Sequence, residues 1–372
     1  MIRFPDMRLL LLLLLTMSAA QAVETLPFDE LVSKHRVTDV TLSPDGAFVA
    51  VLLTTPTPES QSSNLATIDL ASDTAYLLTG YSDMTVRWYA WASDQRLLFA
   101  TGRAAAGGSG AEYRGSLAIN RDGSGATRLD SPRSGQSLSF LARVPADPAH
   151  VLLLRRQVDS DKQEVLRFNL ARRSFRKVAE SDSSVTGWLA DHQGELRIAL
   201  AHDANTGQRR LRYRQDESQA FADTLDLSAN AIRPLAFHGD NRSLIAAIRR
   251  DKANYAIVRA DPLSGKLHEA LVAERGVDVW SAQHSRLFQT VRGLPVYYRY
   301  RGPDGIRQVF FDPRWQMRQD AIDDAISGDN MIAAASDDER RLLVRSSSDD
   351  GNDYYLYDTV AGELRFLLSL TD

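Results

Sequence analysis

The chain has 372 residues, of which 44% are hydrophobic and 25% are charged, and its formal net charge is -4. This composition is that of a folded globular protein, and the mild acidity argues against a nucleic-acid partner. Because the sequence contains no cysteine, disulfides, thiol nucleophiles and thiolate metal sites are excluded.

The first 22 residues have the pattern of a secretory signal peptide. Arg3 and Arg8 stand before or at the start of an apolar run, and small residues follow up to Ala22. A membrane anchor is the alternative, but the apolar stretch 9–20 has 12 residues, fewer than the ~20 that a spanning helix needs. We expect cleavage after Ala22, no membrane span afterwards, a periplasmic or secreted location, and one mature domain over residues 23–372.

A turn followed by an apolar run recurs along the mature chain. Its first copy is "LSPDGAFVAVLL" at 42–53, in which Pro-Asp-Gly forms the turn and the run is apolar at every position, as in a strand buried on both faces. Further copies follow, and each turn carries an aspartate: Asp45, Asp94, Asp147, Asp191, Asp240 and Asp338. The side chain of an aspartate in such a turn accepts hydrogen bonds from the backbone amides of the turn, so we interpret these aspartates as structural residues that stabilise the turns.

The spacing of the copies predicts a propeller. Successive aspartates are 49, 53, 44, 49 and 98 residues apart, and "VWSAQHSRLFQTVRG" at 279–293 fills the double interval with a degenerate copy whose turn has lost its acid. Seven copies of about 49 residues fit the four-stranded blades of a β-propeller. A β-sandwich or barrel array is the alternative, and six or eight blades remain open.

Other stretches agree with this architecture. Five hairpin patterns, among them "LATIDLASDTAYLLTG" at 65–80, supply an outer strand pair for most units. "DPRWQMRQDAIDDAI" at 312–326 breaks the β rhythm and predicts a short inserted helix with Trp315, Ile322 and Ile326 on one face.

Several phrases resemble the N-terminal propeller of the prolyl oligopeptidase family of serine peptidases, which includes bacterial dipeptidyl and acylaminoacyl peptidases. They are "FDELVSKHRVTDVTLSPDGAFVAV", "SDQRLLF", "GWLADHQGELRIAL", "FFDPRWQMRQDAIDDAI" and "LLVRSSSDDGNDYYLYD". The resemblance implies a propeller that controls which peptides reach an α/β-hydrolase domain, which would be expected to begin where this sequence stops. No G-x-S-x-G nucleophile turn occurs in the chain, so no catalytic residue is carried over from the family.

Metal binding has little support in the sequence. No two of the seven histidines have the H-x-x-x-H spacing of a zinc helix, so we expect no metal and no cofactor, and we interpret His192 and His238 as structural. The acid cluster at 349–353 lacks a full calcium loop and is interpreted as a hairpin.

One basic strand is a candidate for peptide contact. "RRLRYR" at 209–214 places Arg210, Arg212 and Arg214 on one face, where they could bind peptide carboxylates if that face lined the channel. An exposed outer strand protected by its charges is the favoured interpretation.

Three functions remain. The first is the non-catalytic, substrate-gating or peptide-binding half of a serine peptidase, whose α/β-hydrolase half is missing, truncated away or separately encoded. The second is a stand-alone periplasmic propeller that binds a peptide or protein. The third, a propeller enzyme such as a lactonase or glycosidase, ranks last because the inner strands lack acids and metal ligands.

Overall fold

The computed structural model describes residues 24–370 apart from 57–60, 105–110, 131–134, 158–159, 182–183, 229–230, 251–253, 282, 284, 291 and 350. The predicted signal peptide lies outside the described residues. No helix in the described part of the chain is long and apolar enough to cross a membrane.

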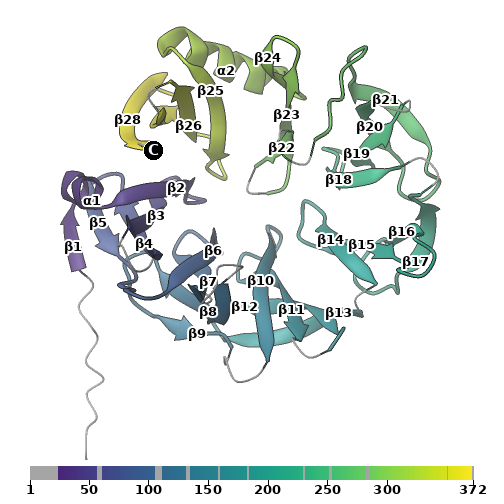
Figure 1. The fold of residues 1–372 in the computed structure, drawn as a ribbon, viewed down its shortest axis with the longest axis horizontal. Coiled ribbons are helices and arrows are strands. Elements are labelled where there is room, and N and C mark those ends of the chain that lie inside the picture. The colour runs from purple at the N-terminus through teal and green to yellow at the C-terminus, as the bar shows by residue number, and fades with distance from the viewer. Residues whose placement is uncertain are drawn as a thin grey trace, which may run out of the picture.

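The chain forms a seven-bladed β-propeller. Seven antiparallel sheets follow one another around a common axis, and each is built from one continuous stretch of sequence (Figure 1). The predicted fold class and the blade number of seven are therefore confirmed. The register of strand pairing within each blade is that of consecutive hairpins.

Blades 1 to 3 come from the N-terminal half. Blade 1 contains β1 (Glu24–Pro27), β2 (Arg36–Leu42), β3 (Phe48–Pro56), β4 (Gln61–Asp69), β5 (Thr74–Leu77) and the helix α1 (Phe28–Lys34). Blade 2 contains β6 (Thr85–Trp91), β7 (Arg96–Ala104), β8 (Ala111–Asn120) and β9 (Thr127–Arg128). Blade 3 contains β10 (Gln136–Arg143), β11 (His150–Gln157), β12 (Gln163–Asn169) and β13 (Ser174–Ser181).

Blades 4 to 7 complete the ring. Blade 4 contains β14 (Val185–Ala190), β15 (Leu196–His202), β16 (Arg209–Tyr213) and β17 (Ala222–Asp226). Blade 5 contains β18 (Arg233–Phe237), β19 (Leu244–Arg249), β20 (Tyr255–Ala260) and β21 (Leu267–Val272). Blade 6 contains β22 (Arg286–Gln289), β23 (Pro295–Gly302), β24 (Gly305–Phe310) and the helix α2 (Pro313–Ala325). Blade 7 contains β25 (Asp329–Ala335), β26 (Arg341–Ser348), β27 (Gly351–Asp358) and β28 (Glu363–Leu370).

The second strand of a blade is apolar at successive positions because each of its faces packs against a different neighbour. In β3, Val49 and Val51 belong to a buried cluster shared with Leu343 of blade 7. The alternate residues Phe48 and Ala50 belong to a cluster shared with blade 2. The core is therefore divided into layers between blades, and the continuous apolar run found in the sequence is what such a strand needs.

The turn aspartates act largely as predicted. Asp45 accepts hydrogen bonds from the Ala47 amide at 3.0 Å and the Ser43 hydroxyl at 2.6 Å. Asp191, Asp240 and Asp338 likewise accept from backbone amides of their own turns. Gly46 has a φ of 68°, and a Cβ there would lie 3.0 Å from the Arg341 side chain of blade 7, so glycine suits this turn on both counts.

Blade 6 departs from the expectation of four strands per unit. Its described residues form three strands, and α2 follows β24 where the fourth strand would be (Figure 1). The helix matches the prediction: Asp312 accepts a hydrogen bond from the Arg314 amide at 2.9 Å as its N-cap, and Trp315 and Ile322 are buried. The two buried side chains pack against blades 6 and 7.

The degenerate copy was placed in the wrong register. We expected Trp280 followed by Arg286, Leu287 and Phe288 to keep the rhythm of the other copies, in which the strand follows the turn. In the structure that strand is β22, the inner strand of blade 6, and the turn follows it at 290–294. Gly293, with a φ of 78°, donates its amide to the Thr290 carbonyl and so replaces the missing aspartate as the turn-forming residue.

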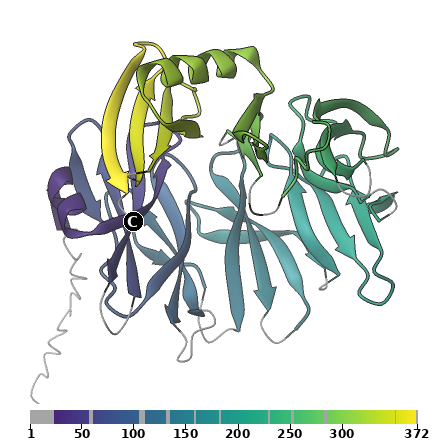
Figure 2. The same cartoon turned by 45° about the horizontal axis from the view of Figure 1, so that its top comes forward.

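The ring closes without exchange of a strand between its two ends. The N-terminal strand β1 pairs with β5 inside blade 1, and the described strands of blade 7 are all C-terminal. Blades 1 and 7 lie side by side (Figure 2) and are joined by side-chain packing and by two hydrogen bonds between their turns. The Asp337 amide donates to the Pro44 carbonyl at 2.6 Å, and the Arg341 guanidinium donates to the Gly46 carbonyl at 2.8 Å.

Candidate functional site: the central cavity

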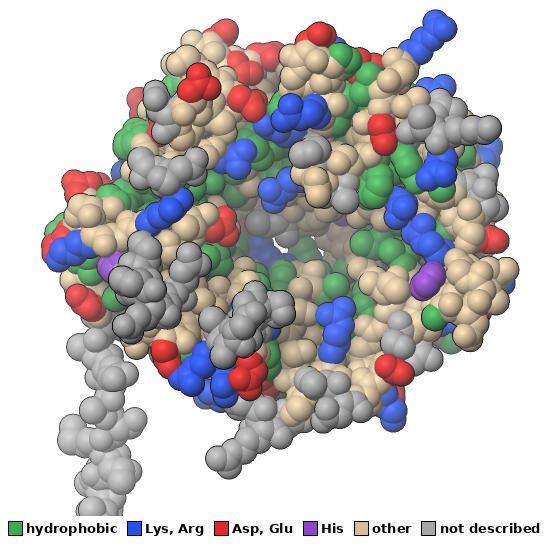
Figure 3. Space-filling view, in the orientation of Figure 1, with side chains coloured by type: hydrophobic (Ala, Val, Ile, Leu, Met, Phe, Trp, Pro, Cys, Tyr) green, Lys and Arg blue, Asp and Glu red, His purple; other side chains and the backbone are tan. Residues whose placement is uncertain are grey.

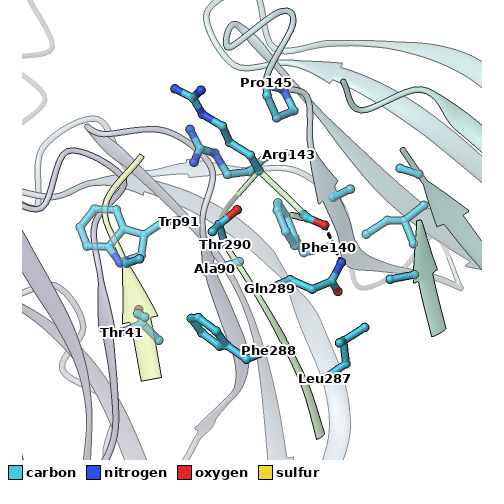
Figure 4. Close-up of a pocket in the computed structure, with 18 of the residues that line it drawn as sticks. Thr41, Ala90, Trp91, Phe140, Arg143, Pro145, Leu287, Phe288, Gln289 and Thr290 are labelled. Atoms are coloured by element: carbon cyan, nitrogen blue, oxygen red, sulfur yellow. Dashed lines mark hydrogen bonds between the residues drawn. The ribbon is translucent and has the colours of Figure 1, made fainter. Parts of the chain in front are cut away.

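All seven blades contribute to a cavity of about 550 Å³ at the end of the ring where the first and second strands of each blade are joined. It is lined by the carboxyl-terminal ends of the inner strands of blades 1 to 5 and 7, and in blade 6 by β22 together with the turn that follows (Figure 4). The volume is in the range of small-ligand sites, so this is the candidate functional site of the chain.

Aromatic side chains contribute to the cavity wall. Trp91, Phe140, Trp188 and Phe288 come from four different blades, and Figure 4 shows Trp91, Phe140 and Phe288 bordering the same space. The indole nitrogens of Trp91 and Trp188 are buried and have no hydrogen-bond acceptor among the described residues. Trp91, Trp188 and Phe288 are only 6–7% exposed and belong to the clusters between blades, so a small part of each ring faces the cavity and makes the wall apolar there.

Tyr89 adds an uncharged polar group to this wall. Tyr89 lies beside Asp39 and Thr41, and burial, assisted by the Asp39 carboxylate, raises the pKa of Tyr89 well above its ordinary value of 10.0. The phenol therefore stays neutral at physiological pH.

One charged pair spans the rim of the cavity. Arg143, at the end of the inner strand of blade 3, binds Asp337 of blade 7 through both guanidinium nitrogens, at 2.9 and 3.2 Å. Blades 1 and 2 lie between these two residues in the ring, so the pair bridges an arc of the cavity mouth. Only 12% of the Arg143 side chain and 28% of the Asp337 side chain are exposed.

The arc beneath this bridge is rich in acids. Arg121 of blade 2 pairs with Asp45 of blade 1 at 2.7 Å and donates to the Asp94 carbonyl at 3.2 Å. Burial and repulsion from Asp45 raise the pKa of Asp94, with Arg143 opposing the shift and Asp337 adding to it.

A second network joins the turns of blades 4 and 5. Buried Arg197 lies 3.4 Å from the Asp191 carboxylate and donates to the Asn241 carbonyl at 2.9 Å. The His192 amide donates to the Asn241 side chain at 3.0 Å, and the His192 ring lies 2.8 Å from the His238 carbonyl. These contacts give His192 and His238 the structural roles that the sequence predicted.

The remaining charges in the cavity wall have no such partners. Arg286 of β22 and Arg292 of the following turn line the cavity, and both are exposed. No hydrogen bond or ion pair joins either guanidinium to another residue in the part of the chain that the structure describes. Within the same part, no three His, Asp or Glu side chains gather closely enough to hold a metal ion. Asp350 of the acid cluster lies outside it.

The arginines singled out from the sequence lie away from this cavity. They belong to β16 and the residue after it, and β16 is the third strand of blade 4, outside the two inner strands. Arg212 pairs with Asp223 at 3.0 Å, and Arg210 is exposed near the same carboxylate. Arg214 is buried and donates to the Leu196 carbonyl at 2.7 Å. The expectation of an exposed outer strand fits Arg210 but is wrong for Arg214, which is buried, and β16 is paired with both β15 and β17, so its charges do not protect a free edge. A peptide contact at Arg210, Arg212 and Arg214 stays a prediction.

Comparison with known proteins finds likeness in structure. No family model and no curated protein matches the chain. The β-propeller domain of the Trilobed protease from Pyrococcus furiosus, whose topology is called open velcro, aligns with a TM-score of 0.55 at 10% identity, over 90% of this chain and 96% of that domain. This chain has the fold of a peptidase propeller.

Two whole peptidases extend the comparison. A prolyl endopeptidase aligns with a TM-score of 0.53 at 10% identity, over 93% of this chain and 51% of its own. The acylaminoacyl peptidase of Pyrococcus horikoshii aligns with a TM-score of 0.52 at 10% identity, over 92% of this chain and 54% of its own. The chain thus spans about half the length of these enzymes, and at such identity the likeness shows the fold alone.

Sequence reasoning missed the residues that give the cavity its charge. Arg286 was placed after a turn, where it would have belonged to a second strand, and Arg292 was left without a role. Arg143 and Asp337 are 194 residues apart, and no local pattern signals their pairing. A usable signal existed in the last residues before each turn, because these positions line the cavity in every blade.

Proposed function

We propose that the chain is the non-catalytic propeller of a prolyl oligopeptidase-like serine peptidase and that it binds extended peptide segments in its central cavity. The observation that carries the proposal is the cavity of about 550 Å³, walled by aromatic side chains from several blades. The likeness to peptidase propellers over nearly the whole chain supports the same assignment.

The chemistry of the wall suits a peptide. Tryptophan and phenylalanine rings provide apolar contact area for peptide side chains, and the exposed edges of the inner strands carry backbone groups that can hydrogen-bond to an extended chain. A globular protein domain is far larger than a space of about 550 Å³, so the cavity suits segments rather than folded partners.

The bridge across the rim supports a gating role. Entry of a peptide from this face passes the arc closed by Arg143 and Asp337. Since each side chain of this pair comes from a different, non-adjacent blade, separation of the pair widens the mouth without breaking strand pairing within a blade. Catalysis is then supplied by an α/β-hydrolase domain or chain.

Tryptophan fluorescence tests the binding. The chain has five tryptophans, and Trp91 and Trp188 line the cavity. Titration of residues 23–372 with capped, alanine-rich pentapeptides is expected to give a saturable change in emission. Ala90 lines the cavity and is half-buried, so Ala90→Phe fills the space and is expected to abolish the change, whereas Ala361→Phe, on an exposed hairpin, leaves it intact.

Two outcomes would overturn the proposal. One is the absence of a saturable change with every peptide, and the other is equal binding by wild type and Ala90→Phe. Cleavage of peptidyl amides by the purified chain would contradict its non-catalytic role. If binding is confirmed without cleavage, a stand-alone peptide-binding propeller is separated from a peptidase half by adding the candidate hydrolase and measuring amide cleavage.

Export is a further part of the proposal. We propose that the signal peptide is removed after Ala22 and that the propeller works outside the cytoplasm. N-terminal sequencing of the protein recovered from periplasm or medium is expected to begin at Val23. Recovery of the chain from the cytoplasm with its original N-terminus would contradict this.

A further inference from the structure

The cavity contains more positive than negative charge once its ion pairs are counted. Among the described residues, four charged side chains line it: Arg143, Asp191, Arg286 and Arg292. Asp337 neutralises the first and Arg197 neutralises the second. The two remaining arginines both belong to blade 6, so the positive charge is concentrated on one wall.

The two arginines lie at different depths. Arg286 is the first residue of β22 and pairs in register with Arg299 of β23, whereas Arg292 lies in the turn at the rim. Arg299 forms an ion pair with Asp329 at 2.5 Å, so the Asp329 carboxylate is paired with Arg299 and not with Arg286. Lys and Arg side chains also border the hollow at the centre of the face shown in Figure 3.

One acid lies near enough to moderate this charge. Asp39, exposed on β2, and Arg286 both act on the Tyr354 phenol: burial raises the pKa of Tyr354, Arg345 lowers it, Asp39 raises it and Arg286 lowers it. No ion pair forms between Asp39 and Arg286 in the described residues. Asp39 and Arg286 thus act with opposite sign on the same phenol, and Asp39 is not among the residues that line the cavity.

We propose that the cavity selects peptides that carry a carboxylate, either an acidic side chain or the C-terminus, and that Arg286 binds this group while Arg292 attracts it at the rim. The inference rests on the proposed peptide-binding function and names its substrate class. A guanidinium binds a carboxylate through two parallel hydrogen bonds, and the surrounding aromatic wall reduces competition from water. The positive charge of these two arginines can attract a carboxylate into the cavity although the whole chain has a net charge of -4.

Matched peptides test the selectivity. The probes are capped pentapeptides of alanine with Glu, Gln or Lys in the centre, together with pentaalanine that has a free or an amidated C-terminus. We expect the Glu peptide to bind about tenfold more tightly than the Gln peptide, the typical effect of a hydrogen bond to a charged group. The free-acid and amide forms of pentaalanine show whether a C-terminal carboxylate serves as well as a side chain.

Variants locate the effect. Arg286→Gln is expected to abolish the preference for Glu over Gln, and Arg286→Lys to keep part of it, since lysine retains the charge but lacks the planar fork. Arg242→Gln is the matched control, because Arg242 is exposed in the turn of blade 5 and is not among the cavity-lining residues. Asp39→Asn is expected to strengthen binding of the Glu peptide, and raising the salt concentration from about 50 to about 500 mM to weaken it.

The outcomes separate this inference from the proposed function. Equal affinity of the wild type for the Glu and Gln peptides, with both binding saturably, would overturn the carboxylate selectivity and leave peptide binding standing. Failure of every peptide would overturn the proposed function itself. If Arg286→Gln does not fold, the Asp39→Asn variant and the salt dependence still test the inference. If neither the Asp39→Asn change nor the higher salt concentration alters the affinity for the Glu peptide, the cavity does not select carboxylates by charge.

Discussion

The turn of blade 6 differs from the turns of the other six blades in what holds it. Those six turns are tied to another blade or share an arginine that links two blades, as Arg121 links the turns of blades 1 and 2. In the blade 6 turn, the hydrogen bonds of the described residues stay within the turn and β22, for example from the Gln289 side chain to the Gly293 carbonyl at 2.7 Å. Blade 6 is instead held from its outer side.

The helix provides that outer support. Gln319 of α2 donates to the Asn330 carbonyl at 3.0 Å, and Arg318 pairs with Glu339 of blade 7 at 3.0 Å. Charged residues at the turns of six blades thus take part in contacts between blades, whereas the described residues give Arg286 and Arg292 of blade 6 no ion pair. Changing one charge at a time tests whether blade 6 differs from the other blades in this way.

The largest effect is expected from the buried network between blades 4 and 5. Arg197→Met removes the cation next to Asp191 and leaves a buried carboxylate without its partner, at an expected loss of about 3–5 kcal/mol in the free energy of unfolding. Urea denaturation followed by tryptophan fluorescence measures the loss. Arg242→Met is the control, since Arg242 is exposed in the neighbouring turn, and a similar midpoint for both variants would show that the network does not stabilise the ring.

A smaller effect is expected at the rim bridge. Asp337→Asn weakens the pair with Arg143, and because Asp337 is partly exposed we expect a loss of about 1 kcal/mol in the free energy of unfolding. The same change is expected to speed peptide association severalfold by opening the mouth, which stopped-flow fluorescence measures. Exchanging the charges with Arg143→Asp and Asp337→Arg together should return both quantities toward wild type. An association rate that stays the same in Asp337→Asn would contradict gating at this bridge.

Asp94 gives a test of the acidic arc through pH. Because burial and Asp45 raise the pKa of Asp94, its charged form is disfavoured in the folded state, so the wild type loses stability as pH rises through that pKa. Asp94→Asn is expected to be more stable than wild type at pH 7 by a few tenths of a kcal/mol, since Asp94 is exposed and solvent screens the repulsion.

The difference at Asp94 should close with acid. Well below the ordinary aspartate pKa of 3.8, the wild-type carboxyl is neutral in the folded and the unfolded state, as the asparagine always is, so the two proteins should unfold at the same urea concentration. A difference that persists or widens at low pH would show that the acids of this arc do not repel one another as the structure implies.

The sequence was informative where a local pattern decides the structure. The buried second strands, the turn aspartates and the helix at 312–326 can be recognised from short local runs of residues, and the structure confirms them. It misled in blade 6, where loss of the aspartate hid a turn that Thr290 and Gly293 form by other means. A glycine in the left-handed region is a weaker sequence signal than Pro-Asp-Gly.

The candidate site was less accessible from the sequence because it is made by closing the ring. Alternation along β16 correctly separated Leu211, which is buried, from Arg210, which is exposed. It could not show that β16 is the third strand of its blade and so lies away from the cavity. The bridge between Arg143 and Asp337 depends on the curvature of seven blades, which no single repeat contains.

The smallest effect is expected on the wall of blade 6, and it separates structure from binding. Arg292 is exposed and has no ion pair among the described residues, so Arg292→Gln should change the free energy of unfolding by no more than about 0.5 kcal/mol. The same variant should lower the affinity for the Glu peptide by less than Arg286→Gln does, because a rim charge acts through screened, longer-range attraction. A loss of stability comparable to that of Asp337→Asn would mean that blade 6 is braced like the others, and the distinction between supporting and ligand-facing charges would fail.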